Sequence, residues 1–334
     1  MALQLNLAVD AMGGDNGPKV VVPAAIRFLD ENPGIELTLF GVQDELLRHF
    51  PNNDPAGISR CHAQFCSQFV ADDESPSAAL RHKQDSSMWL AFQAVAHGRS
   101  QAFISGGNTG AMVAMGLKLL GANEGIDRPA ICTALPTRAG RCYLLDVGAN
   151  VDCTTKQLHQ LALMATNLVR VQEKIAKPSV ALLNIGKESI KGNKVVKEAA
   201  ELFNADASLN YAGFIEADEL LSGRVDIVIC DGFVGNVALK ATEGAVANIL
   251  DRLAVIGKRY STADISAGVM PSLLDALHRE LDPGSYNGAI LLGLKGVTVK
   301  SHGSADVDGF CCALERAVMA VGTDASGSIT NELV

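Results

Sequence analysis

The sequence lacks the short motifs that mark several large enzyme classes. It contains no Gly-x-x-x-x-Gly-Lys-Ser/Thr phosphate loop, no Gly-x-Ser-x-Gly nucleophile elbow, and neither His-Glu-x-x-His nor His-x-x-Glu-His. No clean Gly-x-Gly-x-x-Gly follows the first expected strand, so a dinucleotide-binding dehydrogenase loses its main support. These absences speak against P-loop NTPases, serine hydrolases and zinc proteases, and we expect neither a metal nor a cofactor.

Positive charge is also scarce. The chain has 28 Lys and Arg against 37 Asp and Glu, a formal net charge of −9. This balance speaks against broad nucleic-acid binding, which needs a basic face. The 8 cysteines include no Cys-x-x-Cys pair, so we expect free, mostly buried thiols in a reducing compartment.

Long apolar runs are missing as well. No stretch approaches the roughly 18 uncharged apolar residues of a membrane-spanning helix, and the N-terminus has no basic flank before an apolar run. We therefore expect a cytoplasmic protein, with at most peripheral contact with a membrane.

What the chain does contain is a repeated turn. Six times a short apolar run ends in a polar residue close to glycine, and a helical pattern usually follows. The runs end at Asp10, Ser105, Asp146, Asn184, Asp231 and Lys300. Strands that alternate with helices predict βαβ units and a mostly parallel sheet.

Parallel-sheet enzymes bind ligands where strands end and helices begin. Glycine lets a ligand approach the backbone closely, and amide groups at a helix start favour an anion. The six turns therefore predict one cradle, formed where the carboxyl ends of several strands converge, for an anion such as phosphate.

Helical patterns occupy the gaps between the strands, and two of them bear on the argument below. Ser75-Pro76 predicts a helix start, and the helix is expected to continue to about Ala96 with Trp89 in the core. The segment 243–281 predicts a helical hairpin whose apolar stripe includes Met270 and Leu274. That stripe either faces the core or is exposed for dimerisation or membrane contact.

Three turns carry residue types suited to an anion. His302 follows the last strand, and a pKa near ~6.5 lets histidine act as a general base or hold a phosphate proton. The segment 185–194 combines two glycines with three lysines, although a solvated helix start would look the same. The segment 231–236 (Asp-Gly-Phe-Val-Gly-Asn) follows a buried strand and suits ligand orientation better than packing.

At these residues the chain resembles the PlsX family of phosphate acyltransferases (acyl-[acyl-carrier-protein]:phosphate acyltransferases). The similar segments run in order along nearly the whole chain. They are residues 9–15, 105–111, 128–131, 135–137, 145–150, 183–186, 191–193, 230–236 and 302–304. Two departures stand out: Tyr286-Asn287-Gly288-Ala289-Ile290 replaces the usual Tyr-Gly-Gly-Ala-Pro, and Lys187 and Ile190 replace acidic or small residues.

The resemblance implies a three-layer α/β/α fold with a mostly parallel sheet, like phosphotransacetylase and isocitrate/isopropylmalate dehydrogenases. It implies that inorganic phosphate attacks a fatty acyl thioester on acyl carrier protein, giving acyl phosphate for phospholipid biosynthesis. It further implies a homodimer with loose membrane contact, or contact with a membrane glycerol-3-phosphate acyltransferase. Residues 1–334 are then one catalytic unit with the protruding hairpin at about 243–281.

Site residues follow from matching the family segments to the strand ends. The catalytic candidates are His302, Asp231, Lys191 and Asn236. The candidates for binding phosphate and substrate are Asp10, Gly13, Gly14, Asp15, Gly107, Asn108, Thr109, Asp146, Asn150, Asn184, Gly186, Gly192, Asn193, Gly232 and Lys300. Lysines would offset phosphate charge, amides would hold its oxygens, and carboxylates would orient these groups.

An acidic carrier protein needs a positive docking surface on this acidic chain. Lys187, Lys191, Lys194 and Lys197 form one candidate, and Arg252, Lys258 and Arg259 form another. Three other functions compete: a phosphotransacetylase-like enzyme acting on acyl-CoA, a nicotinamide-dependent dehydrogenase, and a non-catalytic binding protein. We disfavour the last two, because the dinucleotide fingerprint is missing and polar strand ends recur.

Overall fold

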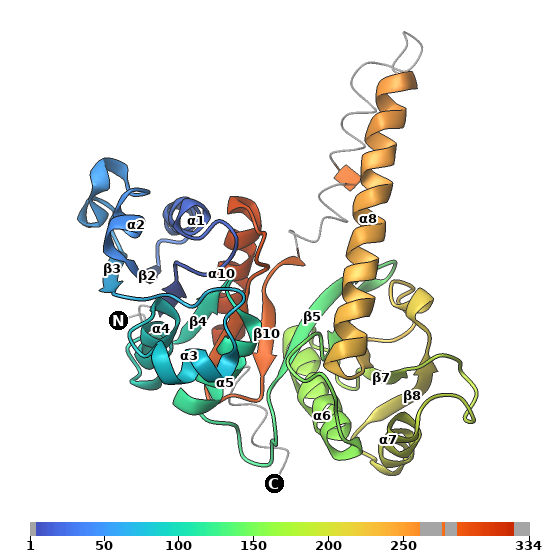
Figure 1. Ribbon diagram of the computed structural model, residues 1–334. Helices are drawn as coiled ribbons and strands as arrows, with labels where there is room; N and C mark the ends of the chain where they lie inside the picture. Colours follow the sequence, from blue (N-terminus) through green and yellow to red (C-terminus); the bar gives the residue numbers. More distant parts are fainter. Residues whose placement is uncertain (1–4, 261–275, 278–285, 324–334) are drawn as a thin grey trace.

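The computed structural model describes residues 5–260, 276–277 and 286–323. In this part of the chain, eleven strands form one sheet in the order β3-β2-β1-β4-β11-β10-β5-β6-β9-β7-β8 (Figure 1). The strands are β1 (Leu5–Asp10), β2 (Ile35–Val42), β3 (Cys61–Cys66), β4 (Ala102–Ser105), β5 (Ala130–Thr137), β6 (Gly140–Leu145), β7 (Ser179–Leu183), β8 (Asn210–Ile215), β9 (Ile227–Ile229), β10 (Ala289–Leu292) and β11 (Val297–Lys300).

Helices connect most of these strands. They are α1 (Pro18–Glu31), α2 (Gln43–Leu47), α3 (Pro76–His82), α4 (Ser87–Ala96), α5 (Thr109–Leu119), α6 (Thr155–Gln172), α7 (Lys194–Ala205), α8 (Gly232–Tyr260) and α10 (Val307–Gly322). The expected alternation of strands and helices is confirmed, and so is a mostly parallel α/β sheet.

The direction of the strands changes in the middle of the sheet. Strands β3, β2, β1, β4 and β11 are parallel to one another, and so are β6, β9, β7 and β8. Between these two sets, β10 is antiparallel to both β11 and β5, and β5 is antiparallel to β6. The second parallel set therefore runs opposite to the first, and its carboxyl ends lie at the opposite edge of the sheet.

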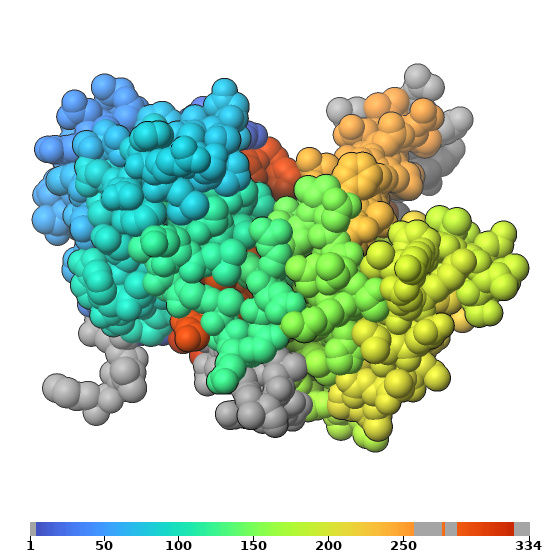
Figure 2. All heavy atoms as spheres, turned by 60° about the horizontal axis from the view of Figure 1, so that its bottom comes forward, coloured from blue at the N-terminus to red at the C-terminus, as the bar shows by residue number. Residues whose placement is uncertain are grey.

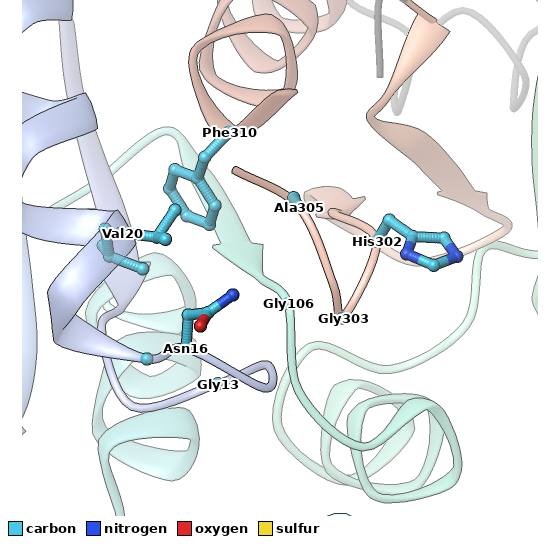
Figure 3. Close-up of a pocket in the computed structure, with 10 residues that line it drawn as sticks. Gly13, Asn16, Val20, Gly106, His302, Gly303, Ala305 and Phe310 are labelled. Carbon is cyan, nitrogen blue, oxygen red and sulfur yellow. The ribbon is translucent and has the colours of Figure 1, made fainter. Parts of the chain in front are cut away.

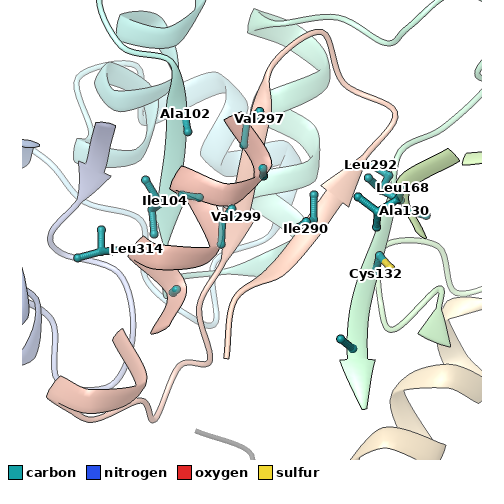
Figure 4. Packing of buried hydrophobic residues seen from close by; sticks show 14 of the residues in the cluster. Ala102, Ile104, Ala130, Cys132, Leu168, Ile290, Leu292, Val297, Val299 and Leu314 are labelled. Carbon is teal, nitrogen blue, oxygen red and sulfur yellow. The ribbon is translucent and has the colours of Figure 1, made fainter. Parts of the chain in front are cut away.

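Side chains of alternating strand positions enter two separate cores. Leu7 and Val9 face one core with helices α1, α6, α7 and α10, whereas Ala8 faces the other with α4 and α5. Figure 4 shows the first core, where Leu314 of α10 and Leu168 of α6 pack over strand residues such as Val299 and Ala130. Helices thus cover both faces of the sheet, and the rigid strands set the positions of the turns that follow them.

The helix expected from Pro76 to Ala96 is in fact two helices. The hydroxyl of Ser86 accepts the backbone N–H of Trp89 at 3.2 Å, so a new helix, α4, begins there. The expectation of one helix was wrong because the second cap lies inside a continuous apolar pattern. Trp89 itself is buried, as expected.

The predicted hairpin is described only in its first half. Helix α8 is 29 residues long and rises away from the half of the sheet that holds β7 and β8 (Figure 1). Met270 and Leu274 lie outside the described residues. Among the helices that the structure describes, none has the length and apolar character needed to span a bilayer.

Candidate active site

The turns after β1 and β4 are joined by a buried carboxylate. Asp10, which is 2% exposed, accepts the hydroxyl of Ser105 at 2.7 Å and the backbone N–H of Met12 at 3.2 Å. The same Ser105 hydroxyl accepts the N–H of Gly107 at 2.9 Å. Burial raises the pKa of Asp10, and these hydrogen bonds oppose that shift. Asp10 therefore holds the two turns together.

The turns after β1 and β11 also touch through their backbones. The N–H of Asp15 donates to the carbonyl of Gly303 at 2.8 Å. Gly14 has a φ of +93°, and a Cβ there would lie 2.8 Å from the same carbonyl. A Cβ on Gly13 would lie 2.6 Å from the N–H of Gly107. The close approach of three turns thus requires glycine at positions 13 and 14.

Lys300 ends β11 beside this junction. Its Nζ donates to the carbonyls of Gly106, at 2.9 Å, and Ser301. Burial lowers the pKa of Lys300 to about 8, and the charges of Asp72, Asp10 and Asp15 oppose that shift. Lys300 is thus mostly charged at neutral pH. Two of its three N–H groups donate to these carbonyls, and the third can donate to a ligand.

His302 is exposed, but both its backbone and its ring are held. Its N–H donates to Oδ1 of the buried Asn287 at 2.8 Å. Its Nδ1 lies 3.2 Å from the backbone nitrogen and 2.8 Å from the Oγ of Ser304. Neither Asn287 nor Ser304 was predicted as a site residue, although Asn287 stood out as a departure from the family pattern.

A small pocket lies under these turns (Figure 3). It is lined by backbone from Gly13, Gly106 and Gly303 and by the side chains of Asn16 and Phe310. It is too small for an acyl chain.

Asn108 and Thr109 begin α5 next to the same turns. The Oδ1 of Asn108 accepts the N–H of Ala111 at 3.0 Å, and its Nδ2 donates to the carbonyls of Ala71, Asp72 and Glu74. The side chain of Asn108 thus caps α5 and holds the loop 71–74.

A second group of predicted residues gathers after β6 and β9. Asp146 is fully buried, and its carboxylate accepts the N–H groups of Ile131, Gly148, Ala149 and Asn150 and the side-chain amide of Asn150. Burial raises its pKa, and these donors oppose the shift. The N–H groups of Gly148, Ala149 and Asn150 belong to the turn after β6, so Asp146 orders its own turn.

Asp231 starts helix α8 beside that turn. Its carboxylate accepts the N–H of Val234 at 2.8 Å, and the next residue, Gly232, donates its N–H to the carbonyl of Asn150 at 2.7 Å. A Cβ on Gly232 would lie 2.5 Å from that carbonyl. Asn236 lies one turn later with its side chain against Gly148. The structure therefore brings Asp146, Asn150, Asp231, Gly232 and Asn236 together.

A third group follows β7. The Nδ2 of Asn184 donates to the carbonyl of Lys191 at 3.3 Å, and Gly192 has a φ of +91° against the Asn184 side chain. Asn193 caps α7 by accepting the N–H of Val196 at 2.9 Å. Lys191 is exposed and Gly186 is buried. These residues form a surface turn after β7, the strand that pairs in parallel with β9.

The expectation that all six turns form one cradle was wrong. Its physical reason is strand direction: the turns after β1, β4 and β11 lie at one edge of the sheet, and those after β6, β7 and β9 lie at the other. Helix α8 starts directly after Asp231, and Glu243 lies about 18 Å further along it. Burial raises the pKa of Glu243, and positive charge on His302 and Lys240 opposes that shift.

Figure 2 shows a notch between the N-terminal lobe and α8, with orange-red residues of the C-terminal segment at its base. Among the described residues, no group of three or more His, Cys, Asp or Glu side chains could hold a metal ion. The candidate active site is therefore the edge formed by residues 10–15, 105–109 and 300–304, which we call the phosphate edge.

Comparisons with known proteins agree with this architecture. A family model described as "Fatty acid synthesis protein" matches residues 5–327. Phosphate acyltransferase of Halorhodospira halophila is 46% identical over 318 residues, covering 95% of this chain and 93% of the relative. Phosphate acyltransferase of Pseudomonas paraeruginosa is 48% identical and covers 94% of each. The chain belongs to the PlsX family.

Solved structures extend the likeness in fold to other members of the α/β class. A phosphotransacetylase from Streptococcus pyogenes aligns with a TM-score of 0.62 at 16% identity, covering 98% of this chain and 96% of that one. A branched-chain phosphotransacylase from Enterococcus faecalis aligns with a TM-score of 0.59 at 17% identity, covering 95% and 99%. Membership of the PlsX family makes the chain an acyltransferase, and the expected phosphotransacetylase-like fold is confirmed.

Proposed function

We propose that this PlsX-family enzyme transfers a fatty acyl group from acyl carrier protein to inorganic phosphate. A phosphate oxygen attacks the thioester carbonyl carbon, and a tetrahedral intermediate forms. The C–S bond then breaks, and the thiolate of the carrier's prosthetic arm leaves and takes up a proton. The products are acyl phosphate and free carrier protein, and we expect phospholipid biosynthesis to consume the acyl phosphate.

The observation that carries this proposal is the phosphate edge. Three strand ends meet there around glycine backbones, and Lys300 supplies a positive charge beside them. A dianion needs such charge, and preorganised positioning can lower a barrier by up to about 7–11 kcal/mol in ideal cases. We propose that the thioester arm enters through the notch between the N-terminal lobe and α8 (Figure 2).

A direct attack by phosphate fits the cysteines of the chain. Burial raises the pKa of Cys230 well above its ordinary value and raises that of Cys153 to about 12. These thiols are therefore protonated at neutral pH and are poor nucleophiles. We propose a ternary complex without an acyl-enzyme, with the lysines and amides holding phosphate as the sequence predicts.

The carrier protein and a membrane remain proposed partners. Of the predicted docking lysines, Lys187 pairs with Glu219 at 2.8 Å and Lys194 with Glu198 at 3.6 Å, whereas Lys191 is exposed. Exposed ion pairs contribute little, so an acidic carrier can displace them. Helix α8 exposes Val237, Ile249 and Val255, which suits a homodimer contact or a membrane surface.

The decisive experiment offers the purified chain acyl carrier protein thioester and phosphate, and traps acyl phosphate with hydroxylamine. We expect acyl phosphate to appear only when both substrates are present, and no acyl group to remain on the protein after rapid quenching. A covalent acyl-protein would overturn direct attack. Acyl-CoA serves as the comparison donor, because the fold likeness to phosphotransacetylases favours it as the second candidate.

A further inference from the structure

The contacts at Nδ1 of His302 select one tautomer of its ring. Its Nδ1 lies 3.2 Å from the backbone nitrogen of Ser304, and that amide can only donate a hydrogen bond. Nδ1 must therefore present its lone pair. The hydroxyl of Ser304 lies 2.8 Å from the same nitrogen and can donate as well. A neutral imidazole with an accepting Nδ1 carries its proton on Nε2.

The backbone of His302 is fixed independently. Asn287 is 8% exposed, and its Oδ1 accepts the N–H groups of His302 and Gly288. Its Nδ2 donates to the Oγ of Ser301 at 2.8 Å and to the carbonyl of Gly309 at 2.7 Å. All four bonds run between groups of the β10, β11 and α10 segments, so Asn287 clamps the loop that carries the histidine.

The ring points away from the small pocket. In Figure 3 the imidazole lies on the side of Gly303 opposite to Asn16 and Phe310. Nε2–H therefore points away from that pocket, and His302 stands two residues after Lys300 in the chain.

We propose that His302 donates its Nε2–H to a phosphate oxygen in the notch, and that Ser304 and Asn287 are the positioning residues that hold it as a donor. This inference rests on the proposed function and deepens it. A general base would need a lone pair at Nε2, and the Ser304 contact puts a proton there instead. The proton that phosphate loses on forming the acyl phosphate is then taken up by the departing thiolate.

Two substitutions separate a donor from a base. His302→Gln puts an amide N–H close to the position of Nε2, whereas His302→Asn puts one close to Nδ1, and neither amide accepts a proton. We expect H302N to raise the KM for phosphate by at least about tenfold, and H302Q to recover at least about fivefold of that loss. Equal losses in both variants would overturn the donor role. A loss confined to kcat would overturn phosphate as the acceptor.

The tautomer can also be measured without turnover. In the full chain labelled with ¹⁵N-histidine, the resonances of His302 are assigned by their disappearance in H302Q. We expect the Nε2–H tautomer in the free enzyme and a shift of the Nε2 resonance on titration with inorganic phosphate. The Nδ1–H tautomer, or a resonance unmoved by phosphate, would overturn the proposal.

Together with the acyl phosphate assay, these two measurements distinguish failure of the donor role of His302 from failure of the proposed acyl-transfer function. If the wild-type chain forms no acyl phosphate with either thioester donor, the proposed function fails whatever the tautomer is. If the wild type is active and the tautomer is Nδ1–H, only the donor role fails. Thermal midpoints of H302Q and H302N within a few degrees of wild type are the control for folding.

Discussion

The Oδ1 of Asn287 accepts the backbone N–H of His302 at 2.8 Å. Asn287 lies just before β10, and His302 lies just after β11. The two residues are 15 positions apart in the chain, and β10 and β11 pair between them. A single buried amide thus fixes the end of the strand that leads into the phosphate edge.

Asn287→Ala should lower the free energy of unfolding by about 2–3 kcal/mol, because it leaves buried hydrogen-bonding groups of Ser301, His302 and Gly309 without their partner. Chemical denaturation measures the effect. Asn204→Ala on the exposed side of α7 is the matched control, and we expect it to change little. If the two variants are equally stable, the clamp contributes nothing.

The charge of Lys300 should control the binding of phosphate at alkaline pH. Since burial lowers its pKa to about 8, the lysine loses its charge as the pH rises through that value, and the KM for phosphate should rise. Lys300→Arg keeps the charge at these pH values. Phosphate ionises equally in both assays, so the KM of the wild type divided by the KM of Lys300→Arg reports on the lysine alone. We expect this ratio to grow by about fivefold from pH 7 to pH 9. A constant ratio would remove Lys300 from phosphate binding.

Alanine substitutions at Gly14 and Gly98 distinguish the cost of backbone strain from the cost of a steric clash with a neighbouring turn. Both have a positive φ, +93° and +69°, but a Cβ on Gly14 would lie 2.8 Å from the carbonyl of Gly303, whereas nothing lies within 4 Å at Gly98. We expect Gly98→Ala to cost about 1 kcal/mol from strain alone. Gly14→Ala should cost at least about 1 kcal/mol more and abolish phosphate binding. Thermal unfolding and phosphate titration check both, and equal costs would argue against a tight junction of the turns.

Asp231 offers a test of its role as a helix cap. Its carboxylate accepts the N–H of Val234 at 2.8 Å, and asparagine caps helices about as well as aspartate. Asp231→Ala should therefore cost about 1 kcal/mol of stability and Asp231→Asn much less. With the fold intact, the acyl-transfer rate of Asp231→Asn reports on the carboxylate's charge alone. Similar stability losses in both variants would mean that capping is not what Asp231 supplies.

Local patterns in the sequence predicted much of the fold. Apolar runs followed by polar residues and glycine predicted β1, β4, β6, β7, β9 and β11, because burial and turn formation depend on neighbouring residues. The edge strand β3 was missed, since Cys61–Cys66 has no apolar run and pairs on one side only. The family segments likewise lie where the strands end.

The roles within the site were harder to predict. Asp10 and Asp146 had been expected to orient lysines and amide side chains, yet most of the groups that donate to them are backbone N–H groups of their own turns. No property of an aspartate at a strand end reveals whether it faces a ligand or the chain. Asn287 and Ser304 were missed because their partners depend on how distant segments pack.

The sequence by itself determined the α/β class, the glycine turns and the membership of the acyltransferase family, since each depends on residue types in short segments. Only the tertiary structure decided which turns share an edge. The antiparallel pairings of β10 and β5 reverse the second half of the sheet, and pairing between distant strands leaves no trace in local periodicity. For the same reason, only the folded chain sets the backbone of His302 against Asn287, 15 residues earlier.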